Sequence, residues 1–202
     1  MNAKIRTYRP DDERTLYDIC LLTGDSGEDA TALYRDPTLL GEVYVGPYLR
    51  FPAALALVGD DDGAAGYVLG VPDTVAFERW CEREWWPGLR DRYPLGTFPP
   101  ESPDDRIVRL IHTPPTAAPE VVERYPAHLH IDLLPRLQGR GAGRRLLTAL
   151  LDGMASAGAP GIHLGVARAN ERAIGFYRRM GFVEVRAYSH SLVMARTLCG
   201  PS

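Results

Sequence analysis

Lysine and cysteine are scarce in this chain of 202 residues. Lys4 is the only lysine among 23 basic residues, so arginine carries almost all of the positive charge. The three cysteines, Cys20, Cys81 and Cys199, are odd in number and far apart in the sequence. They predict neither a disulfide framework nor a zinc site, and this usage is typical of a reducing compartment. We therefore expect a cytoplasmic protein.

Long apolar runs and a strong excess of either charge are also lacking. No run approaches the roughly 20 apolar residues of a membrane-spanning helix, and no apolar segment of the secretory type follows Met1. The formal net charge of −3 is poorly suited to non-specific nucleic-acid binding. Since there is neither an internal repeat nor a flexible linker, we expect one domain over residues 1–202. We expect neither a membrane nor a nucleic acid as its partner.

Alternating and helical hydrophobic patterns predict strands and helices in turn. Strands are predicted at residues 5–8, 54–58, 65–71, 127–134, 162–166, 182–185 and 189–194. Helices are predicted at about residues 12–22, 30–44, 143–157 and 170–180. This order indicates a mixed α/β sheet with helices on both faces.

Residues 72–126 form an insert whose pattern is irregular. Residues 74–89 have helical spacing, but a proline-rich segment follows, with a short candidate strand at 107–111. Because proline removes a backbone donor and fixes φ, we expect ordered loops or edge segments there. The tryptophans at positions 80, 85 and 86 either wall an acceptor site or fill the core, and core filling is the more common role of aromatic residues.

A glycine-rich turn, Gln138-Gly139-Arg140-Gly141-Ala142-Gly143, joins the strand at 127–134 to the next helix. Glycines let the main chain approach an anion closely, and the first N–H groups of a helix lack intrahelical partners and favour negative charge. Nearby arginines add positive charge: Arg136, Arg140, Arg144 and Arg145. The turn matches neither a Walker loop, which needs Gly-Lys-Ser/Thr, nor the G-x-G-x-x-G dinucleotide fingerprint. It predicts a phosphate site of another kind, or a purely structural connection.

Two motifs resemble those of the GNAT superfamily of acyl-CoA N-acyltransferases. The spacing Gln138-x-x-Gly141-x-Gly143 is similar to the Q/R-x-x-G-x-G/A motif of that family. The stretch from Asn170 to Phe182, Asn-Glu-Arg-Ala-Ile-Gly-Phe-Tyr-Arg-Arg-Met-Gly-Phe, resembles its N-x-x-A-x-x-F/L-Y-x-x-x-G-F helix. The motifs occur in the family's order, and the resemblance covers essentially the whole chain.

The resemblance implies a GNAT fold, an α/β fold with a mixed central sheet splayed at the cofactor site. Helices would cover both faces, and the insert would precede the fourth core strand. It also implies acetyl-CoA as co-substrate, its pyrophosphate on the glycine turn and its pantetheine arm beside the main chain of that strand. The implied cofactor-binding residues are Leu133, Leu134, Gln138, Gly139, Arg140, Gly141, Ala142, Gly143, Arg144, Asn170 and Tyr177.

A narrower likeness is carried by residues 5–12, 17–20 and 124–135, the last reading Arg-Tyr-Pro-Ala-His-Leu-His-Ile-Asp-Leu-Leu-Pro. These segments look like the acetyltransferase-like C-terminal domain of O-GlcNAcase. We expect a free-standing bacterial relative of that domain, without glycosidase activity.

Tyr177 lies seven residues after Asn170, so both side chains share a helix face. By resemblance, Tyr177 is the general acid that protonates the leaving thiolate of coenzyme A, since a phenol within reach can do so. The alternative is a core tyrosine beside Phe176 and Met180. Asn170 is expected to cap its helix, a role compatible with contact to the cofactor arm.

His128, His130 and Asp132 project to one face of their strand, while the leucines and isoleucine between them project to the other. Attack on a thioester needs a neutral amine, so a carboxylate or imidazole near the splay could remove the ammonium proton. Asp132 is our first candidate for this base and His130 the second, while His128 is excluded as structural. The alternative is that these groups are satisfied within the fold.

These residues predict an acetyl-CoA-dependent N-acetyltransferase with an amine acceptor, a small molecule or a protein. The alternative is a non-catalytic acetyl-CoA-binding or interaction module. Acidic residues at 25, 28 and 29 would attract a cationic amine or form a solvated loop. No metal is expected, because His112, His163 and His190 are scattered. A homodimer through the final strands is a further expectation from the resemblance.

Overall fold

A computed structural model describes residues 3–198, whose strands form one seven-stranded sheet in the order β1-β2-β3-β4-β5-β7-β6. The strands are β1 (Lys4–Thr7), β2 (Leu55–Asp60), β3 (Ala64–Val71), β4 (Ala127–Leu133), β5 (Gly161–Ala167), β6 (Val183–Ala187) and β7 (Ser191–Thr197). All pairings are antiparallel except that of β4 with β5, so the sheet is mixed. The prediction of a mixed α/β sheet is therefore confirmed, and each predicted strand outside the insert is present.

Helices connect these strands on both faces. The α-helices are α1 (Glu13–Leu22), α2 (Leu39–Tyr44), α3 (Gly46–Arg50), α4 (Thr74–Trp80), α5 (Trp86–Arg92), α6 (Pro103–His112), α7 (Pro119–Val122), α8 (Ala142–Ser156) and α9 (Glu171–Arg179). Short 3₁₀ turns occupy Pro10–Asp12 and Pro135–Leu137, and a π-helical segment at Cys81–Trp85 joins α4 to α5. No helix within residues 3–198 is both long and apolar enough to cross a membrane.

The helical spacing predicted at 74–89 of the insert is confirmed by α4, the π-helical segment and α5, whereas the irregular pattern predicted after it also contains α6 and α7. The expected strand at 107–111 is part of α6. Ser102 Oγ accepts a hydrogen bond from the N–H of Asp105 (3.2 Å), and Pro103 occupies the first turn. Proline suits a helix start because its missing N–H would have no intrahelical partner there. Pro103 and Pro119 therefore begin helices, while the other prolines of the proline-rich segment, at 94, 99, 100, 114 and 115, lie in loops as predicted.

Residues 30–44 contain less helix than their pattern predicts. Turns occupy residues 31–38, and α2 forms only at Leu39–Tyr44. The insert holds this stretch, because the buried carboxylate of Asp104 accepts from the N–H groups of Arg35 (3.0 Å) and Asp36 (3.1 Å). Tertiary hydrogen bonds thus replace the intrahelical bonds that the periodicity predicts.

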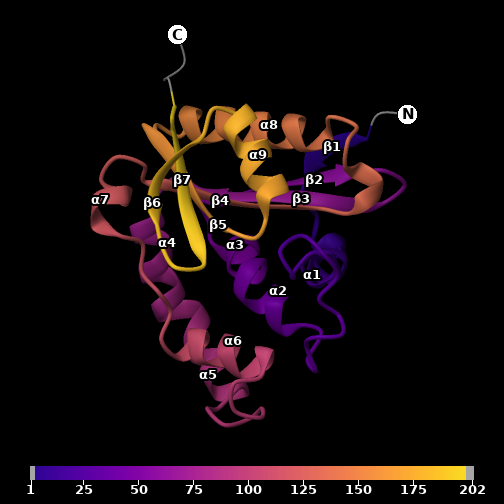
Figure 1. Ribbon diagram of the computed structural model, residues 1–202, viewed down its shortest axis with the longest axis vertical. Helices are drawn as coiled ribbons and strands as arrows, with labels where there is room; N and C mark the ends of the chain where they lie inside the picture. The colour runs from indigo at the N-terminus through magenta and orange to yellow at the C-terminus, as the bar shows by residue number, and fades with distance from the viewer. Residues whose placement is uncertain (1–2, 199–202) are drawn as a thin grey trace.

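Two hydrophobic clusters cover the two faces of the sheet. Helices α1 and α2 and the insert pack on one face, and α8 and α9 pack on the other (Figure 1). Strand β3 shows the alternation, since Tyr67 and Leu69 join the first cluster while Val68 joins the second. The tryptophans of the insert fill the first cluster, with Trp86 7% exposed, which confirms core filling as their role.

Strands β4 and β5 are parallel but pair over only two positions, Ala127 with Ile162 and His128 with His163. Beyond these pairs β5 continues to pair with β7, whereas β4 continues to pair with β3. The two strands therefore diverge toward their carboxyl ends. This divergence is the splay that the GNAT resemblance predicts, and it leaves one edge of β4 uncovered at residues 129–133.

Candidate active site at the splayed strands

A cavity of about 810 Å³ lies where β4 and β5 diverge. Its wall is formed by the end of β4, the glycine turn, the start of α9 and the loop after α1. Its volume lies within the range of roughly 300–1,000 Å³ found for ligand pockets. Most of the predicted site residues line it: Asp132, Leu133, Gln138, Gly139, Gly141, Gly143, Arg144, Asn170 and Tyr177.

The glycine turn presents the start of α8 to this cavity. Gly139 and Gly141 have φ values of 72° and 76°, a left-handed conformation that glycine adopts without strain. The first intrahelical hydrogen bond runs from the N–H of Arg145 to the carbonyl of Gly141 (3.1 Å), and no side chain caps the helix. The preceding N–H groups are therefore available at the positive end of the helix dipole. The turn has the chemistry of an anion site.

Gln138 stabilises the turn from within. Its side-chain Nε2 donates to the carbonyl of Leu133 (2.7 Å), and its main-chain N–H donates to the carbonyl of Pro135 (3.1 Å). The side chain thus connects the end of β4 to the beginning of the turn. One N–H of its side-chain amide is used in this way within the fold, where it fixes the turn.

Three predicted cofactor-binding residues, Leu134, Arg140 and Ala142, lie outside the cavity wall. The main-chain N–H of Leu134 donates to the carbonyl of Ala65 in β3 (2.9 Å), so it points away from the splay. The Ala142 side chain is buried, 1% exposed, and packs against Ala65 and Leu137. Arg140 is exposed at the outer side of the turn. The structure gives these three side chains no contact with the cavity.

Arginines at the cavity come from two helices. Arg144 lies at the start of α8, and Arg172 and Arg179 lie on α9. The sequence analysis did not identify Arg172 and Arg179, although their spacing from Phe176 places the three residues on one face of α9. Two of the arginines counted near the glycine turn point elsewhere, because Arg136 donates to the carbonyl of Ala64 and Arg145 to that of Ala3.

The Asp132 carboxylate is half-buried at the end of β4 and lines the cavity. Burial raises its pKa to about 6, against the opposing effects of the Tyr67 and Thr23 hydroxyls. Tyr67 Oη donates to Asp132 Oδ2 at 2.5 Å. Sequence reasoning missed Tyr67, which lies 65 residues away and meets Asp132 only through the register of β3 and β4. At neutral pH this carboxyl is mostly ionised and able to accept a proton.

His130 and His128 lie behind the cavity rather than in its wall. The ring of His130 packs against Tyr44 and Tyr48, and burial lowers its pKa to about 4. His128 is fixed on both ring nitrogens, with Nδ1 2.8 Å from Thr74 Oγ1 and Nε2 2.6 Å from Tyr48 Oη. The structure therefore gives no support to His130 as the base and explains the structural role expected of His128.

Tyr177 and Asn170 are positioned by α9. Tyr177 is 7% exposed, packs between Phe176 and Phe182, and lines the cavity. Burial and the nearby Asp132 charge raise the pKa of its hydroxyl well above the usual value, so the phenol stays protonated at neutral pH. Asn170 Oδ1 accepts from the N–H of Ala173 (3.0 Å), which confirms the predicted helix cap.

The loop after α1 brings acidic side chains to the same cavity. Asp25 and Glu28 are in its wall, where their main chains pair with each other. Asp29 is not, because its carboxylate accepts from the N–H (2.8 Å) and the hydroxyl (2.5 Å) of Thr31. The loop lies close to the cap of α9, since a side chain on Gly27 would meet Asn170 Nδ2 at 3.4 Å. Among the residues described, no three His, Cys, Asp or Glu side chains gather as a metal site.

We expect the stability of the chain to depend on the ionisation of Asp132. Its pKa is about 6 in the fold and about 3.9 in an unfolded chain, so the fold binds this proton more tightly. The contribution is present below about pH 4 and lost as the pH rises through about 6, on the order of 1–3 kcal/mol. Urea unfolding across this range measures the free energy of unfolding of wild type and of Asp132→Asn. The difference, wild type minus variant, should decrease as the pH rises. Parallel pH curves for the two proteins would contradict this.

Comparisons with known proteins agree with this geometry. The model of the Acetyltransferase (GNAT) family matches residues 34–182. The crystal structure of SsHAT has 39% sequence identity and a TM-score of 0.90, covering 98% of this chain and 100% of that one. The paiA N-acetyltransferase from Thermoplasma acidophilum, in complex with coenzyme A, has a TM-score of 0.56 and 17% identity, with 98% and 99% coverage. This second likeness shows the fold alone.

Protein O-GlcNAcase of Rattus norvegicus is 27% identical over 184 residues, which are 90% of this chain and 20% of that protein. The chain thus spans about a fifth of the length of this relative. The match confirms the expected likeness to the acetyltransferase-like region of O-GlcNAcase. From the family model, the splay and the seven-stranded sheet, we conclude that the chain belongs to the acetyltransferase (GNAT) family.

Proposed function

We propose that this chain is an acetyl-CoA-dependent N-acetyltransferase that moves the acetyl group directly from the thioester to an amine. The observation that carries the proposal is the meeting of three features in one cavity. These are the uncapped start of α8, the Asp132 carboxylate and the Tyr177 hydroxyl. The first suits a diphosphate, and the other two supply an acceptor and a donor of protons.

The residues present fit coenzyme A. The N–H groups at the start of α8 and the side chains of Arg144, Arg172 and Arg179 would hold its phosphates. The uncovered edge of β4 would hold its extended arm. Leu134 pairs with β3, so main-chain groups of alternate residues face the splay, including those of Ile131 and the N–H of Leu133, whose carbonyl is bonded to Gln138. When bound, acetyl-CoA supplies an acetyl group activated as a thioester.

Asp132 and Tyr177 divide the proton transfers between them. Attack needs the neutral amine, and Asp132, ionised above about pH 6, takes the proton from the ammonium form. The new C–N bond forms as the C–S bond breaks, Tyr177 donates a proton to the departing sulfur, and the second proton lost by the nitrogen restores the Tyr177 hydroxyl. An N–H group of the uncovered β4 edge, such as that of Ile131, would polarise the acyl carbonyl. The products are an acetylated amine and free coenzyme A.

The acidic loop favours a cationic acceptor. Asp25 and Glu28 line the cavity that contains Asp132, so two further carboxylates share the cavity with the proposed base. Carboxylates in a recessed site attract and orient a protonated amine. We therefore place the acceptor at the α1 end of the cavity and the phosphates at the glycine turn.

Replacement of Gly141 by alanine should weaken acetyl-CoA binding at least tenfold. The residue adopts φ 76° at the start of α8, and alanine would shift the turn to relieve strain of roughly 1 kcal/mol. Gly158→Ala is the matched control, because Gly158 has φ 83°, open surroundings and a position at the far end of α8. Isothermal titration calorimetry should show near-normal binding for the control. Equal affinities for both variants, or no binding to wild type at millimolar acetyl-CoA, would contradict the proposal.

Replacement of Tyr177 by phenylalanine should lower kcat by about 10²–10⁴-fold with little change in the Kd of acetyl-CoA, because only the proton donor is lost. Release of free thiol with a panel of amines and peptides measures the turnover. Equal turnover of wild type and variant would remove Tyr177 from this role. Tight acetyl-CoA binding by a wild-type chain that releases no thiol with any acceptor would instead indicate a binding module.

Asp25→Asn and Glu28→Gln should each raise KM for a cationic amine about tenfold, and salt should reduce the difference from wild type. Asp29→Asn is the control within the same loop, since that side chain bonds Thr31 outside the cavity. Steady-state kinetics with a cationic and a neutral acceptor test the effect. A KM increase in the control of the same size would show that net charge, not position, matters.

A further inference from the structure

Tyr67 places its hydroxyl against the proposed base from the neighbouring strand. Tyr67 of β3 pairs directly with Asp132 of β4, and both side chains project to the α1 face of the sheet. The Tyr67 side chain is fully buried, at 0% exposure, and its Oη donates to Asp132 Oδ2 at 2.5 Å. A hydroxyl that is removed from water and bonded to an ionised oxygen forms a short, strong hydrogen bond.

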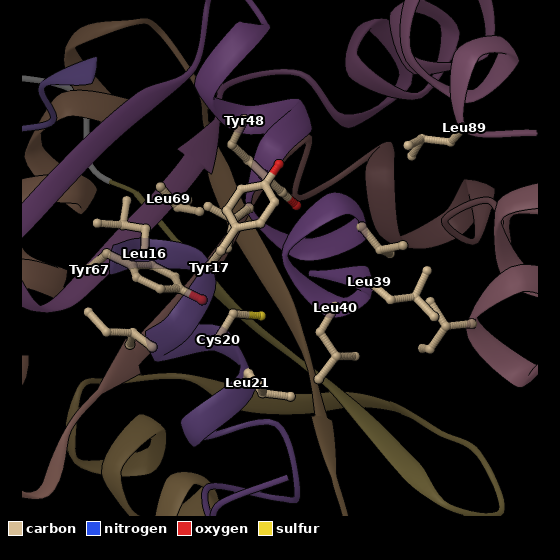
Figure 2. Close-up of a cluster of buried hydrophobic side chains, with 14 of the residues drawn as sticks. Leu16, Tyr17, Cys20, Leu21, Leu39, Leu40, Tyr48, Tyr67, Leu69 and Leu89 are labelled. Atoms are coloured by element: carbon tan, nitrogen blue, oxygen red, sulfur yellow. The ribbon is translucent and has the colours of Figure 1, made fainter. Parts of the chain in front are cut away.

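The Tyr67 hydroxyl donates its proton to one charged acceptor, the Asp132 carboxylate. Figure 2 shows the Tyr67 hydroxyl directed toward Cys20 within the cluster beneath the sheet. The Cys20 thiol is buried, and burial raises the thiol's pKa, so it is protonated at neutral pH. An ionised carboxylate only accepts hydrogen bonds, so the Tyr67 proton points to Asp132 while the thiol can donate to the Tyr67 oxygen.

We propose that Tyr67 is a positioning residue for the acetyl transfer, holding the Asp132 carboxylate toward the cavity in the orientation that accepts the amine proton. The inference rests on the proposed role of Asp132 as the base. Tyr67 does not line the cavity, so it acts on the reaction only through Asp132. Its hydrogen bond favours the ionised carboxylate and opposes the effect of burial.

Other groups face Asp132 from each element packed around it. Thr23 and Cys20 approach from α1 and its end, and Tyr177 approaches from α9. Asp25 and Glu28 share the cavity. These groups remain in a Tyr67→Phe variant, which therefore isolates one hydrogen bond. Its loss should raise the pKa of Asp132 by about one unit, since hydrogen bonds to charged groups are the stronger ones.

The test compares Tyr67→Phe with Tyr48→Phe. Tyr48 is a buried tyrosine of the same cluster (Figure 2). Its hydroxyl lies 2.6 Å from His128 Nε2 rather than at Asp132. Titration of the Asp132 carboxyl by ¹³C NMR should show a pKa about one unit higher in Tyr67→Phe and unchanged in Tyr48→Phe. The acid limb of the kcat pH profile should move by the same amount, with kcat about fivefold lower near pH 6, about tenfold lower near pH 5, and KM for acetyl-CoA unchanged.

A 3-fluorotyrosine placed at position 67 keeps the shape of the side chain and makes its hydroxyl a stronger donor, so it serves if the phenylalanine variant fails to fold. It should lower the pKa of Asp132. Two results would overturn the inference. One is an Asp132 titration that is unchanged in both Tyr67→Phe and the 3-fluorotyrosine protein, and the other is an equal shift in Tyr67→Phe and Tyr48→Phe. If the titration shifts as expected but Asp132→Asn turns over like wild type, Asp132 is not the base, and the proposed mechanism fails together with the role of Tyr67.

Discussion

The structure depends on the separation of β4 from β5 after two paired positions. Up to His128 the strands share hydrogen bonds, and beyond it each keeps only its outer neighbour. A sheet interior normally satisfies every backbone group by pairing, so an uncovered strand edge beside a cavity needs another partner. The same divergence opens space between the strand ends, where the glycine turn and α9 begin. The recognition groups of the site are thus largely main-chain groups, and the fold itself supplies them.

Electrostatics then divide the cavity into regions of different character. Uncapped N–H groups and Arg144 make the glycine-turn part of the cavity positive, whereas Asp25, Glu28 and Asp132 add negative charge from the loop after α1 and the end of β4. Helix α9 contributes both signs, through Glu171, Arg172 and Arg179. Burial raises the pKa of Asp132 and so keeps the carboxyl protonated to a higher pH, and the hydrogen bond from Tyr67 opposes this increase. Tyr177 lies in the wall of the same cavity, where burial and the Asp132 charge raise the pKa of its hydroxyl and keep the phenol protonated. The two proposed proton carriers therefore favour complementary protonation states.

The sequence predicted the parts of the site that are local in the chain. The glycine turn and the helix from Asn170 to Tyr177 are contiguous segments, so their spacing was sufficient to locate them. The partner of Asp132 could not be found in this way, because Tyr67 meets it through strand register. Leu134 was misplaced for a related reason, since the direction of its N–H depends on which residues of β4 pair with β3.

Other differences had signals in the sequence. Helix α6 begins with Ser-Pro-Asp-Asp, a capping residue followed by proline and two acids, which outweighs the short apolar run at 107–111. The cavity arginines Arg172 and Arg179 share a helix face with Phe176. By contrast, no local pattern could predict the turns at 31–38, which depend on hydrogen bonds from a segment about 70 residues later.

The attachment of the insert has a consequence for how this protein could diversify. Asp104 binds the main chain at Arg35 and Asp36, and the Tyr93 hydroxyl donates to the Asp36 carboxylate at 2.7 Å. These hydrogen bonds hold the chain a few residues after the acidic loop, and none of them involves the glycine turn. Under the proposed function, remodelling of the insert would therefore reshape the acceptor side of the cavity while the glycine turn stayed intact. Such separation would let substrate preference evolve independently of the acyl donor.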